Sequence, residues 1–527
     1  MLLSLVHPLL WGSTLLFTSG AAASQALSRC STNGINLPST PGLIVSSTSI
    51  QPVIDYSILG QTANPEVEQN VTISFCNITI NYGHQGWKDD VQVTIWLPLD
   101  NWNERLSGIG GAGFSSLYTF NRFAPAISRG YAAVGTDAGH DHNPLNTSTW
   151  ALDAQGNVNF YLLQNFFAIS QAEAAIMAKQ VISAFYGREP KFSYWDGCST
   201  GGRQGFMLAQ RYPDLYDGIL AGAPAFNWAN FVPGTYYPQF VMNQLKHYPA
   251  PCVLEYINTQ AKKACDSLDG VTDGIVSSPD SCTFDPYSVV GHTGTCNGQH
   301  FSITTQDAEI VQKVWHGTTG TNGTFLWYGM NKGTTFSNVG NTTCTATECQ
   351  GVPFGVASEW LGRFVLQDPE FDLTSLSESG FEGVFKQSVA AYKSVASTDD
   401  PNLSGFREAG GKLIHWHGLA DQQIYPKGSE DYYKRAEALD HDLRHFYRFF
   451  EAPGVGHCGH GYDSHAYGLQ PADPFSVLVN WVEKGIAPDV LPASTPDAIY
   501  SRNLCPYPQV PVYHGGDPKK AESFNCK

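Results

Sequence analysis

The apolar residues between positions 50 and 99 alternate with polar ones, as they do in half-buried β-strands. A period of two residues places successive side chains on opposite faces of a sheet. Shorter apolar runs that end at Leu106, and others at 131–134 and 191–195, predict three more strands. The alternating positions of the first region include Val71, Ile73, Phe75, Val91, Val93, Ile95 and Leu97.

Two later segments have the periodicity of helices. Residues 165–186 carry one apolar face and residues 203–212 another, and a short apolar strand follows at 218–221. Because strands and helices alternate here, we expect parallel strands in an α/β sheet that helices cover on both faces.

This alternation stops at about residue 228 and resumes at about residue 405. The resumed part predicts strands at 412–416 and 446–450 and helices at 429–439 and 475–483. The simplest arrangement is one sheet domain, formed by residues 24–227 and 405–527. Residues 228–404 are then an inserted lid domain that shapes the substrate pocket.

Composition and charge narrow the classes of partner. The chain has 527 residues, 42% of them hydrophobic, and a net charge of −17, and it contains no basic run. A phosphate-binding surface needs clustered Lys and Arg, so we expect no nucleic-acid partner. Residues 1–23 have the short apolar run and small residues of a secretory signal peptide, and no later segment reaches transmembrane length.

A secretory route agrees with two further features of the chain. It has twelve cysteines, which suit an oxidising compartment, and six Asn-x-Ser/Thr acceptor sites for glycosylation. We therefore expect a secreted, extracellular glycoprotein without a membrane partner. The six sites are Asn70, Asn77, Asn146, Asn322, Asn341 and Asn402.

The strand at 191–195 leads into the motif Gly197-Cys198-Ser199-Thr200-Gly201 and then into a helix. Strand, sharp turn and helix are the context of a nucleophile elbow, in which Ser199 is exposed at a helix N-terminus. The Thr200 N–H would then face a developing oxyanion. In a chain with 52 glycines, Gly-x-Ser-x-Gly can also occur by chance. The strand before the motif and the helix after it favour the catalytic interpretation.

A second oxyanion donor is expected from the glycine cluster at 108–113, near Gly111, because such clusters precede the elbow in serine hydrolases of this architecture. An ordinary tight turn explains the cluster equally well.

A nucleophilic serine needs a base, and the base needs an orienting carboxylate. Asp421 follows the strand at 412–416, and His457 follows the strand at 446–450. The order Ser199, Asp421, His457 is that of α/β-hydrolases, so we predict an α/β-hydrolase core with these three catalytic residues.

Other interpretations of these residues remain. Asp421 also suits a turn, and His457 also suits a structural loop. The neighbouring His415, His417 and His460 compete with His457 for the role of base. Metal binding by these four histidines is conceivable, but no His-Glu-x-x-His spacing supports it.

Two cysteines flank the predicted catalytic residues. Cys198 precedes Ser199 and Cys458 follows His457, so contact between serine and histidine would bring the two cysteines within disulfide range. Sequence alone does not establish this connectivity. Cys30 and Cys76 are the obvious pair to fasten the N-terminal segment to the first sheet region.

These motifs resemble the "CS-D-HC" signature of the fungal tannase/feruloyl esterase family, and the resemblance covers nearly the whole mature chain. It implies a serine esterase with an α/β-hydrolase core and a lid, a disulfide between Cys198 and Cys458, and hydrolysis of plant phenolic esters through an acyl-enzyme.

The inserted region holds Asp- and Gly-rich residues at 265–275. Hard oxygen ligands in such a loop suit Ca²⁺, although a metal-free turn explains the composition too. The family's lid carries a calcium loop of this form. The resemblance therefore implies a structural Ca²⁺ here, in a loop that a disulfide between Cys265 and Cys282 closes. The implied ligands are the side chains of Asp266, Asp269 and Asp273 and the carbonyls of Val271 and Ile275.

The remaining cysteines are less determined. Cys505 and Cys526 would fasten the C-terminus. The pairing of the other four is open: Cys252, Cys296, Cys344 and Cys349.

The resemblance implies a carboxylic-ester hydrolase that releases ferulic, caffeic or p-coumaric acid from a small phenolic ester or from an ester linked to cell-wall polysaccharide. A tannase acting on galloyl esters is the alternative within the family. Outside it, a secreted serine peptidase or a silent hydrolase-fold binding protein shares parts of the pattern. The sequence gives no oligomeric state.

Overall fold

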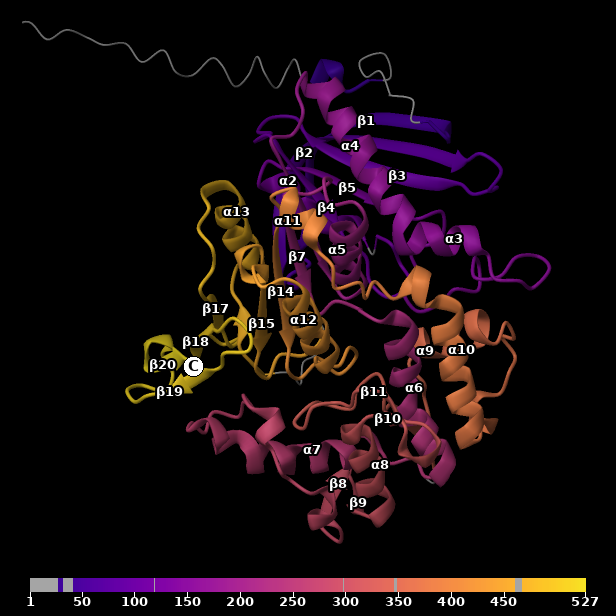
Figure 1. Cartoon of the computed structure of the whole chain (residues 1–527), viewed down its shortest axis with the longest axis vertical. Coiled ribbons are helices and arrows are strands. Elements are labelled where there is room, and N and C mark those ends of the chain that lie inside the picture. Colours follow the sequence, from indigo (N-terminus) through magenta and orange to yellow (C-terminus); the bar gives the residue numbers. More distant parts are fainter. Residues whose placement is uncertain (1–26, 32–40, 118, 297, 346–347, 460–466) are drawn as a thin grey trace, which may run out of the picture.

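A computed structural model describes residues 27–527 except 32–40, 118, 297, 346–347 and 460–466. Within these residues nine strands form one twisted sheet in the order β1-β2-β3-β5-β4-β6-β7-β14-β15 (Figure 1). The first three strands and the β3–β5 pair are antiparallel, and every pair from β5 to β15 is parallel. The strands are β1 (Leu43–Gln61), β2 (Glu68–His84), β3 (Val91–Pro98), β4 (Arg105–Ile109), β5 (Ala132–Thr136), β6 (Phe192–Cys198), β7 (Gly218–Gly222), β14 (Lys412–Gly418) and β15 (Tyr447–Ala452).

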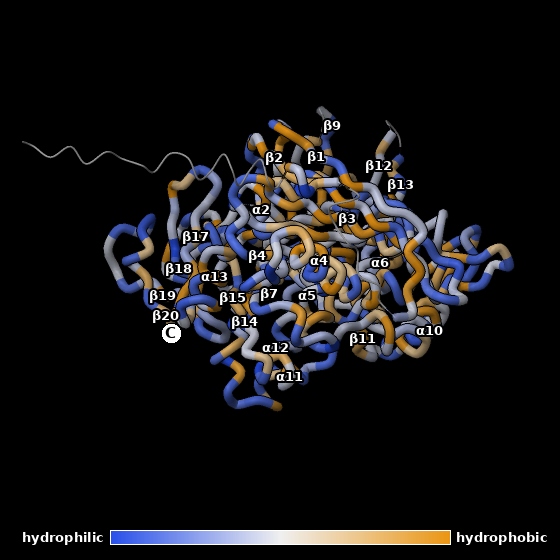
Figure 2. Tube along the Cα trace, turned by 90° about the horizontal axis from the view of Figure 1, so that it is seen from above, coloured by the Kyte–Doolittle hydropathy of each residue, from blue (hydrophilic) through white to orange (hydrophobic). Residues whose placement is uncertain are grey.

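Helices cover both faces of the parallel strands. Neighbouring residues of one strand join different apolar clusters: Tyr194 packs with the cluster that includes α13, and Trp195 packs with the cluster that includes α4, α5 and α12. This is the pattern of a sheet buried on both sides, and it confirms the predicted α/β class. These helices are α2 (Ala124–Ser128), α4 (Ser170–Tyr186), α5 (Thr200–Arg211), α12 (Lys427–Leu439) and α13 (Pro474–Lys484). In Figure 2 the hydrophobic residues gather in the interior, and the outlying loops are mostly hydrophilic.

The helix predicted at 165–186 is interrupted. It begins as a π-helical turn η2 (Asn165–Ile169) and continues as α4, and a further short helix, α3 (Phe160–Gln164), comes directly before it. The fully buried Arg203 of α5 lies over the rings of Phe166 and Phe167 in this turn. Its guanidinium donates to the carbonyl oxygen of Phe167 at 2.9 Å. Arg203 thus fastens the helix that follows Ser199 to its neighbour.

Residues 228–404 lie between β7 and β14 in the sequence and occupy the lower part of Figure 1. Their helices and small hairpins supply most of one apolar cluster, which also includes Phe114, Trp150 and Phe166 of the sheet domain but no residue of the nine strands. No strand of this region joins the nine-stranded sheet, among the residues described. Its longer helices are α6 (Trp228–Leu245), α7 (Pro251–Cys265), α8 (Thr305–His316) and α10 (Glu378–Ala396).

All twelve cysteines are described and form six disulfides. Four of these pairs match the expected ones: Cys30–Cys76, Cys198–Cys458, Cys265–Cys282 and Cys505–Cys526. The two pairs that the sequence left open are Cys252–Cys296 and Cys344–Cys349.

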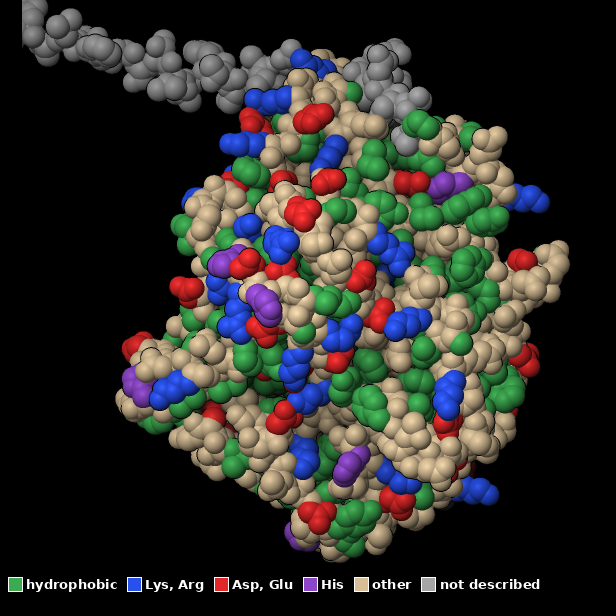
Figure 3. All heavy atoms as spheres, viewed as in Figure 1, with side chains coloured by type: hydrophobic (Ala, Val, Ile, Leu, Met, Phe, Trp, Pro, Cys, Tyr) green, Lys and Arg blue, Asp and Glu red, His purple; other side chains and the backbone are tan. Residues whose placement is uncertain are grey.

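The predicted signal peptide at 1–23 lies outside the described residues. None of the described helices is both long enough and apolar enough to cross a membrane. On the face seen in Figure 3, Lys and Arg are interspersed with Asp and Glu and form no continuous basic area.

Candidate active site

Ser199 lies at a sharp turn between β6 and α5, in a backbone conformation with φ 63° and ψ −125°. A side chain rarely adopts this conformation without support from its surroundings. The support comes from three glycine backbones in close contact. A Cβ on Gly197 would lie 2.5 Å from the Gly201 backbone, and a Cβ on Gly110 would lie 2.6 Å from the Gly201 Cα. The motif therefore forms the predicted elbow, and the glycines that flank Ser199 have no room for a side chain larger than hydrogen.

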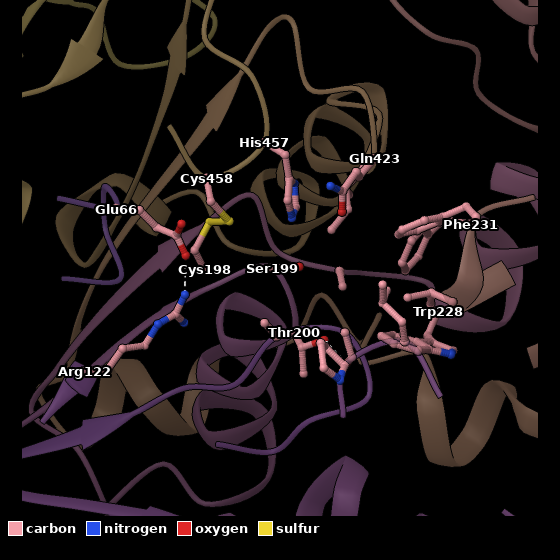
Figure 4. Close-up of a pocket in the computed structure, with 18 residues that line it drawn as sticks. Glu66, Arg122, Cys198, Ser199, Thr200, Trp228, Phe231, Gln423, His457 and Cys458 are labelled. Atoms are coloured by element: carbon pink, nitrogen blue, oxygen red, sulfur yellow. Dashed lines mark hydrogen bonds and ion pairs between the residues drawn. A yellow bond between two sulfur atoms is a disulfide. The ribbon is translucent and has the colours of Figure 1, made fainter. Parts of the chain in front are cut away.

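Asp421 and His457 lie in the loops after β14 and β15, and both are almost fully buried. The His457 Nδ1 is 2.8 Å from the Asp421 Oδ2, and the Asp421 Oδ1 accepts hydrogen bonds from the backbone N–H groups of Gln423 and Ile424 at 2.8 Å. Figure 4 shows the His457 ring pointing toward Ser199. Three segments far apart in the sequence thus meet at the carboxyl ends of neighbouring parallel strands.

The other candidate bases occupy different positions. His417 is fully buried, with its Nε2 3.1 Å from the Asp421 Oδ2 and 2.8 Å from the Ile424 carbonyl oxygen. Its Nδ1 lies 2.7 Å from the Ser429 hydroxyl. With two acceptors beside Nε2, the ring carries its proton there and donates to Asp421. His417 therefore positions the Asp421 carboxylate by a hydrogen bond and does not itself line the pocket.

His415 is also fully buried, and its Nδ1 lies 2.8 Å from the Tyr447 hydroxyl. Neither His415 nor His417 lines the pocket that contains Ser199. His460, the third competitor, lies outside the described residues.

The charge of Asp421 is set by its partners. Burial raises the pKa of the Asp421 carboxyl, but the charge of His457 and the hydrogen bonds from His417 and His457 lower it more. Its pKa therefore lies well below the usual value. Asp421 is ionised whenever His457 takes up a proton, and it can stabilise the imidazolium.

The loop that carries His457 is held at three points. The disulfide between Cys198 and Cys458 ties it directly to the elbow, with the two Cα atoms 5.9 Å apart. The His457 N–H donates to the Gln422 side chain at 3.1 Å, and the Glu66 N–H donates to the Cys458 carbonyl oxygen at 3.3 Å. Serine and histidine are thus positioned by a covalent link and two hydrogen bonds.

The predicted oxyanion donors differ in their availability. Thr200 is the first residue of α5, so its N–H has no acceptor within the helix. The Gly111 N–H donates to the Gln204 side chain at 2.9 Å, and Gly111 does not line the pocket. Gly111 was therefore the wrong choice, because a side chain of α5 already uses its N–H.

Two residues further along, Gly113 lines the pocket, and its N–H has no acceptor among the described residues. The Gly113 carbonyl accepts a hydrogen bond from the Thr200 hydroxyl at 2.6 Å, which keeps the two backbones together. Of the glycines in this cluster, Gly113 is the one that lines the pocket, and its N–H is not used by another described residue. Sequence alone did not distinguish it, since the distinction depends on Gln204.

The pocket around Ser199 has two unlike ends (Figure 4). On one side of Ser199 lie Trp228 and Phe231 of α6. Phe354 of the inserted region also lines the pocket. On the other side lie Glu66 and Arg122, which form a buried ion pair. The sequence patterns singled out none of these residues, because each belongs to a different segment without a motif.

Gln423 is another residue that sequence reasoning missed. Its side chain lines the pocket between His457 and Phe231 (Figure 4) and is 6% exposed. The amide nitrogen is buried and has no hydrogen-bond partner among the described residues. A buried donor without a partner costs free energy, so a substrate oxygen at this point would satisfy it.

The predicted calcium loop follows α7 and includes η3 (Asp266–Asp269). Asp266 accepts hydrogen bonds from the N–H groups of Asp273 and Gly274 at 3.0 Å, and the other two carboxylates accept similar bonds within the loop. The Asp273 Oδ2 also lies 2.9 Å from the Arg502 guanidinium.

Burial, together with the charges of Asp269 and Asp266, raises the pKa of Asp273 to about 6 despite the nearby Arg502. Hard, mutually repelling carboxylates have the chemistry that Ca²⁺ prefers. Their side chains, however, face loop N–H groups and Arg502. The described residues contain no group of three or more His, Cys, Asp or Glu arranged as a metal site. The donor chemistry fits the ion, and the loop lies in the inserted region rather than in the pocket.

A mostly parallel sheet, an elbow serine and an Asp–His pair in this chain order define the α/β-hydrolase class of serine hydrolases. The family model for tannase and feruloyl esterase matches residues 76–527. The chain belongs to this family of carboxylic-ester hydrolases.

Individual relatives agree with this assignment. The chain is 38% identical over 521 residues to a probable feruloyl esterase of Arthroderma benhamiae, a match that covers 96% of this chain and 95% of the relative. Feruloyl esterase B of Aspergillus niger is 29% identical and covers 86% of this chain and 87% of its own length.

Two solved structures are similar over nearly the whole molecule. Tannin acyl hydrolase from Aspergillus niger has a TM-score of 0.84 at 25% identity, with 96% of this chain and 94% of that chain covered. Feruloyl esterase B from Aspergillus oryzae has a TM-score of 0.77 at 26% identity, with 95% and 100% covered. Both support the fold and the family.

Proposed function

We propose that this protein is a feruloyl esterase: a serine hydrolase that releases ferulic, caffeic or p-coumaric acid from phenolic esters. The observation that carries the proposal is the pocket itself. Ser199 and His457 share it with an aromatic wall, and Asp421 holds His457 by a 2.8 Å hydrogen bond. The relative with 38% identity over 96% of this chain is named as a probable feruloyl esterase.

In the proposed mechanism the Ser199 Oγ attacks the ester carbonyl while His457 Nε2 takes the hydroxyl proton. Asp421 holds the opposite nitrogen and stabilises the imidazolium that forms. The alcohol leaves with the proton from His457, and the acyl group stays on Ser199. Water, deprotonated by His457, then hydrolyses the acyl-enzyme and regenerates the serine.

The oxyanion of each tetrahedral intermediate is placed against the N–H groups of Thr200 and Gly113. These two donors lie at the pocket and are free of other acceptors in the described structure. Fixed donors of this kind are typically worth about 10²–10³ in rate each. Gly113 replaces Gly111 in this role because the Gly111 N–H is used by Gln204.

The phenolic ring of the substrate is placed against Trp228, Phe231 and Phe354, which offer a broad apolar surface. A planar hydroxycinnamoyl group gains both apolar burial and ring contacts there. The Gln423 amide supplies a hydrogen-bond donor at the same end of the pocket.

Tannase activity on galloyl esters is the second candidate, and one observation favours it: the TM-score of 0.84 to tannin acyl hydrolase. The curated relatives over most of the chain are feruloyl esterases. Galloyl and hydroxycinnamoyl groups differ in length, so a substrate panel separates the two candidates.

We also propose that the protein is secreted and glycosylated and that Ca²⁺ stabilises the loop at 265–275. The twelve paired cysteines suit an oxidising compartment. Four of the six acceptor asparagines are well exposed, and the loop is cross-linked by Cys265–Cys282. In this proposal the carboxylates of Asp266, Asp269 and Asp273 and the carbonyls of Val271 and Ile275 hold the ion. Its role is structural.

The test is hydrolysis of methyl ferulate, methyl caffeate, methyl p-coumarate and methyl gallate by the wild type and by Ser199→Ala. We expect turnover of the cinnamates, and a loss of about 10⁴-fold or more in kcat for the variant with an unchanged melting temperature. Turnover of the gallate alone would assign the protein to the tannases. Activity that survives in a folded Ser199→Ala variant would contradict the mechanism.

A further inference from the structure

Glu66 and Arg122 form an ion pair in the wall of the active-site pocket, and the proposed mechanism makes no use of it. Glu66 lies just before β2, and Arg122 ends the short helix η1 (Phe120–Arg122). The Arg122 Nη2 contacts the Glu66 Oε1, and the two side chains are 2% and 7% exposed. The pair is thus as buried as the core, yet it faces the cavity that receives the substrate.

Folding stability alone gives a weak reason for such a pair. Removing two charges from water costs about as much as their attraction returns, and an apolar pair of the same size is often as stable. The position of the pair is more informative. The Glu66 N–H donates to the Cys458 carbonyl, so this end of the pocket is fastened to the loop of His457.

The two ends of the pocket suit different parts of an ester substrate. In Figure 4, Glu66 and Arg122 lie on one side of Ser199, and Trp228 and Phe231 lie on the other. A phenolic ring placed on the ion pair would cover two charges with apolar surface, at a cost in free energy. The ring therefore belongs at the aromatic end, and the alcohol part of the ester extends from the carbonyl toward Glu66 and Arg122.

The chemistry of the pair matches a hydroxyl-rich alcohol. A guanidinium offers only donors and a carboxylate only acceptors, whereas each hydroxyl group both donates and accepts. Two adjacent hydroxyls can therefore accept from Arg122 and donate to Glu66 at once, through charge-assisted hydrogen bonds. A methyl group has neither function and would leave the pair as it is.

We infer that Glu66 and Arg122 form the alcohol-binding subsite and select esters whose alcohol is polyhydroxylated, such as a sugar. This inference rests on the proposed esterase function and deepens it. Specificity then has two separate sources: aromatic contacts for the acid and one ion pair for the alcohol.

The experiment compares kcat/KM for methyl ferulate and for a ferulate ester of arabinose, in the wild type and in Glu66→Gln and Arg122→Gln. We expect the wild type to prefer the sugar ester. Loss of a charge-assisted hydrogen bond to the substrate should lower this preference about ten- to hundredfold in either variant. We expect methyl ferulate hydrolysis to change far less, because the methyl ester does not reach the subsite.

A matched control is Glu483→Gln. Glu483 forms an ion pair with Arg105 at 2.5 Å, with side chains 13% and 24% exposed, and neither residue lines the pocket. This variant loses a partly buried ion pair of the same type, and its preference for the sugar ester should equal that of the wild type. Melting temperatures of all three variants report any general loss of stability.

Three outcomes would overturn the inference. They are a wild type without preference for the sugar ester, an equal fall for both esters in the Glu66 and Arg122 variants, and the same loss of preference in Glu483→Gln. The comparison of the two esters in the wild type can overturn the inference even if a variant does not fold. Failure of the wild type to hydrolyse methyl ferulate and the sugar ester alike would instead contradict the proposed function.

Discussion

The sheet domain and the inserted region contribute different things to one pocket. Ser199, Asp421 and His457 come from loops at the carboxyl ends of parallel strands, where the sheet fixes their relative positions. All three residues of the aromatic wall, Trp228, Phe231 and Phe354, come from residues 228–404, which share no strand with that sheet in the described structure. We therefore propose that the chemistry depends on the sheet and that the choice of acid depends on the insertion. Substitutions in the two regions should therefore affect different kinetic constants.

The largest effect is expected from Asp421→Asn in the sheet domain. The amide keeps the shape of the side chain, but it removes the charge that stabilises the imidazolium and the acceptor that fixes the His457 tautomer. We expect kcat for methyl ferulate to fall about 10⁴-fold with little change in KM.

A folded Asp421→Asn variant with more than about a tenth of the wild-type kcat would contradict the assignment, since a triad member contributes orders of magnitude. Circular dichroism would establish that the variant is folded. If Asp421→Asn instead raised KM and left kcat unchanged, the predicted difference between the sheet domain and the insertion would be contradicted.

In the insertion, Phe354→Ala should act on binding. Phe354 is half-buried and lines the pocket, so its removal should delete a ring contact with the substrate and little of the core. We expect KM for methyl ferulate to rise about tenfold, which corresponds to the free energy of one aromatic contact. We expect kcat to stay close to that of the wild type.

Phe325→Ala is a suitable control, because Phe325 belongs to the same region and is 58% exposed. Steady-state kinetics of both variants would sharpen the comparison between sheet and insertion. A fall in kcat without a change in KM for Phe354→Ala would show that the insertion takes part in the chemistry.

The smallest effect is expected from calcium removal. If Ca²⁺ holds the loop at 265–275, chelation removes a ligand that binds only the folded protein. The free energy of unfolding should then fall by roughly 1–3 kcal/mol, and the melting temperature should fall by a few degrees. Activity at room temperature should be nearly unchanged, because the loop does not line the active-site pocket. Differential scanning calorimetry with and without chelator measures the shift.

Asp269→Asn provides the matched variant, since it removes one of the proposed ligands while keeping the side chain's size. Its melting temperature should respond less to chelator than that of the wild type. No shift on chelation of the wild type would contradict the calcium proposal and leave the rest of the comparison intact.

Strand and helix periods were sufficient to predict the α/β class, because burial on two faces leaves a clear apolar pattern. They also placed Ser199, Asp421 and His457 after strands, and parallel strands bring such loops to one edge. The insertion has no such period, so its wall residues were not predicted. Phe354 and Trp228 line the same pocket only because α6 packs against other segments of the inserted region.

By itself, the sequence determined the elbow motif, the chain order of the three proposed catalytic residues, and the family, since these depend on local patterns and spacing. Only the tertiary structure decided which glycine N–H is free, because Gln204 occupies that of Gly111. The same holds for His417, which holds Asp421, and for Glu66 and Arg122, which lie 56 residues apart and meet beside Ser199. Contacts between distant segments depend on how the whole chain packs, and no local pattern records them.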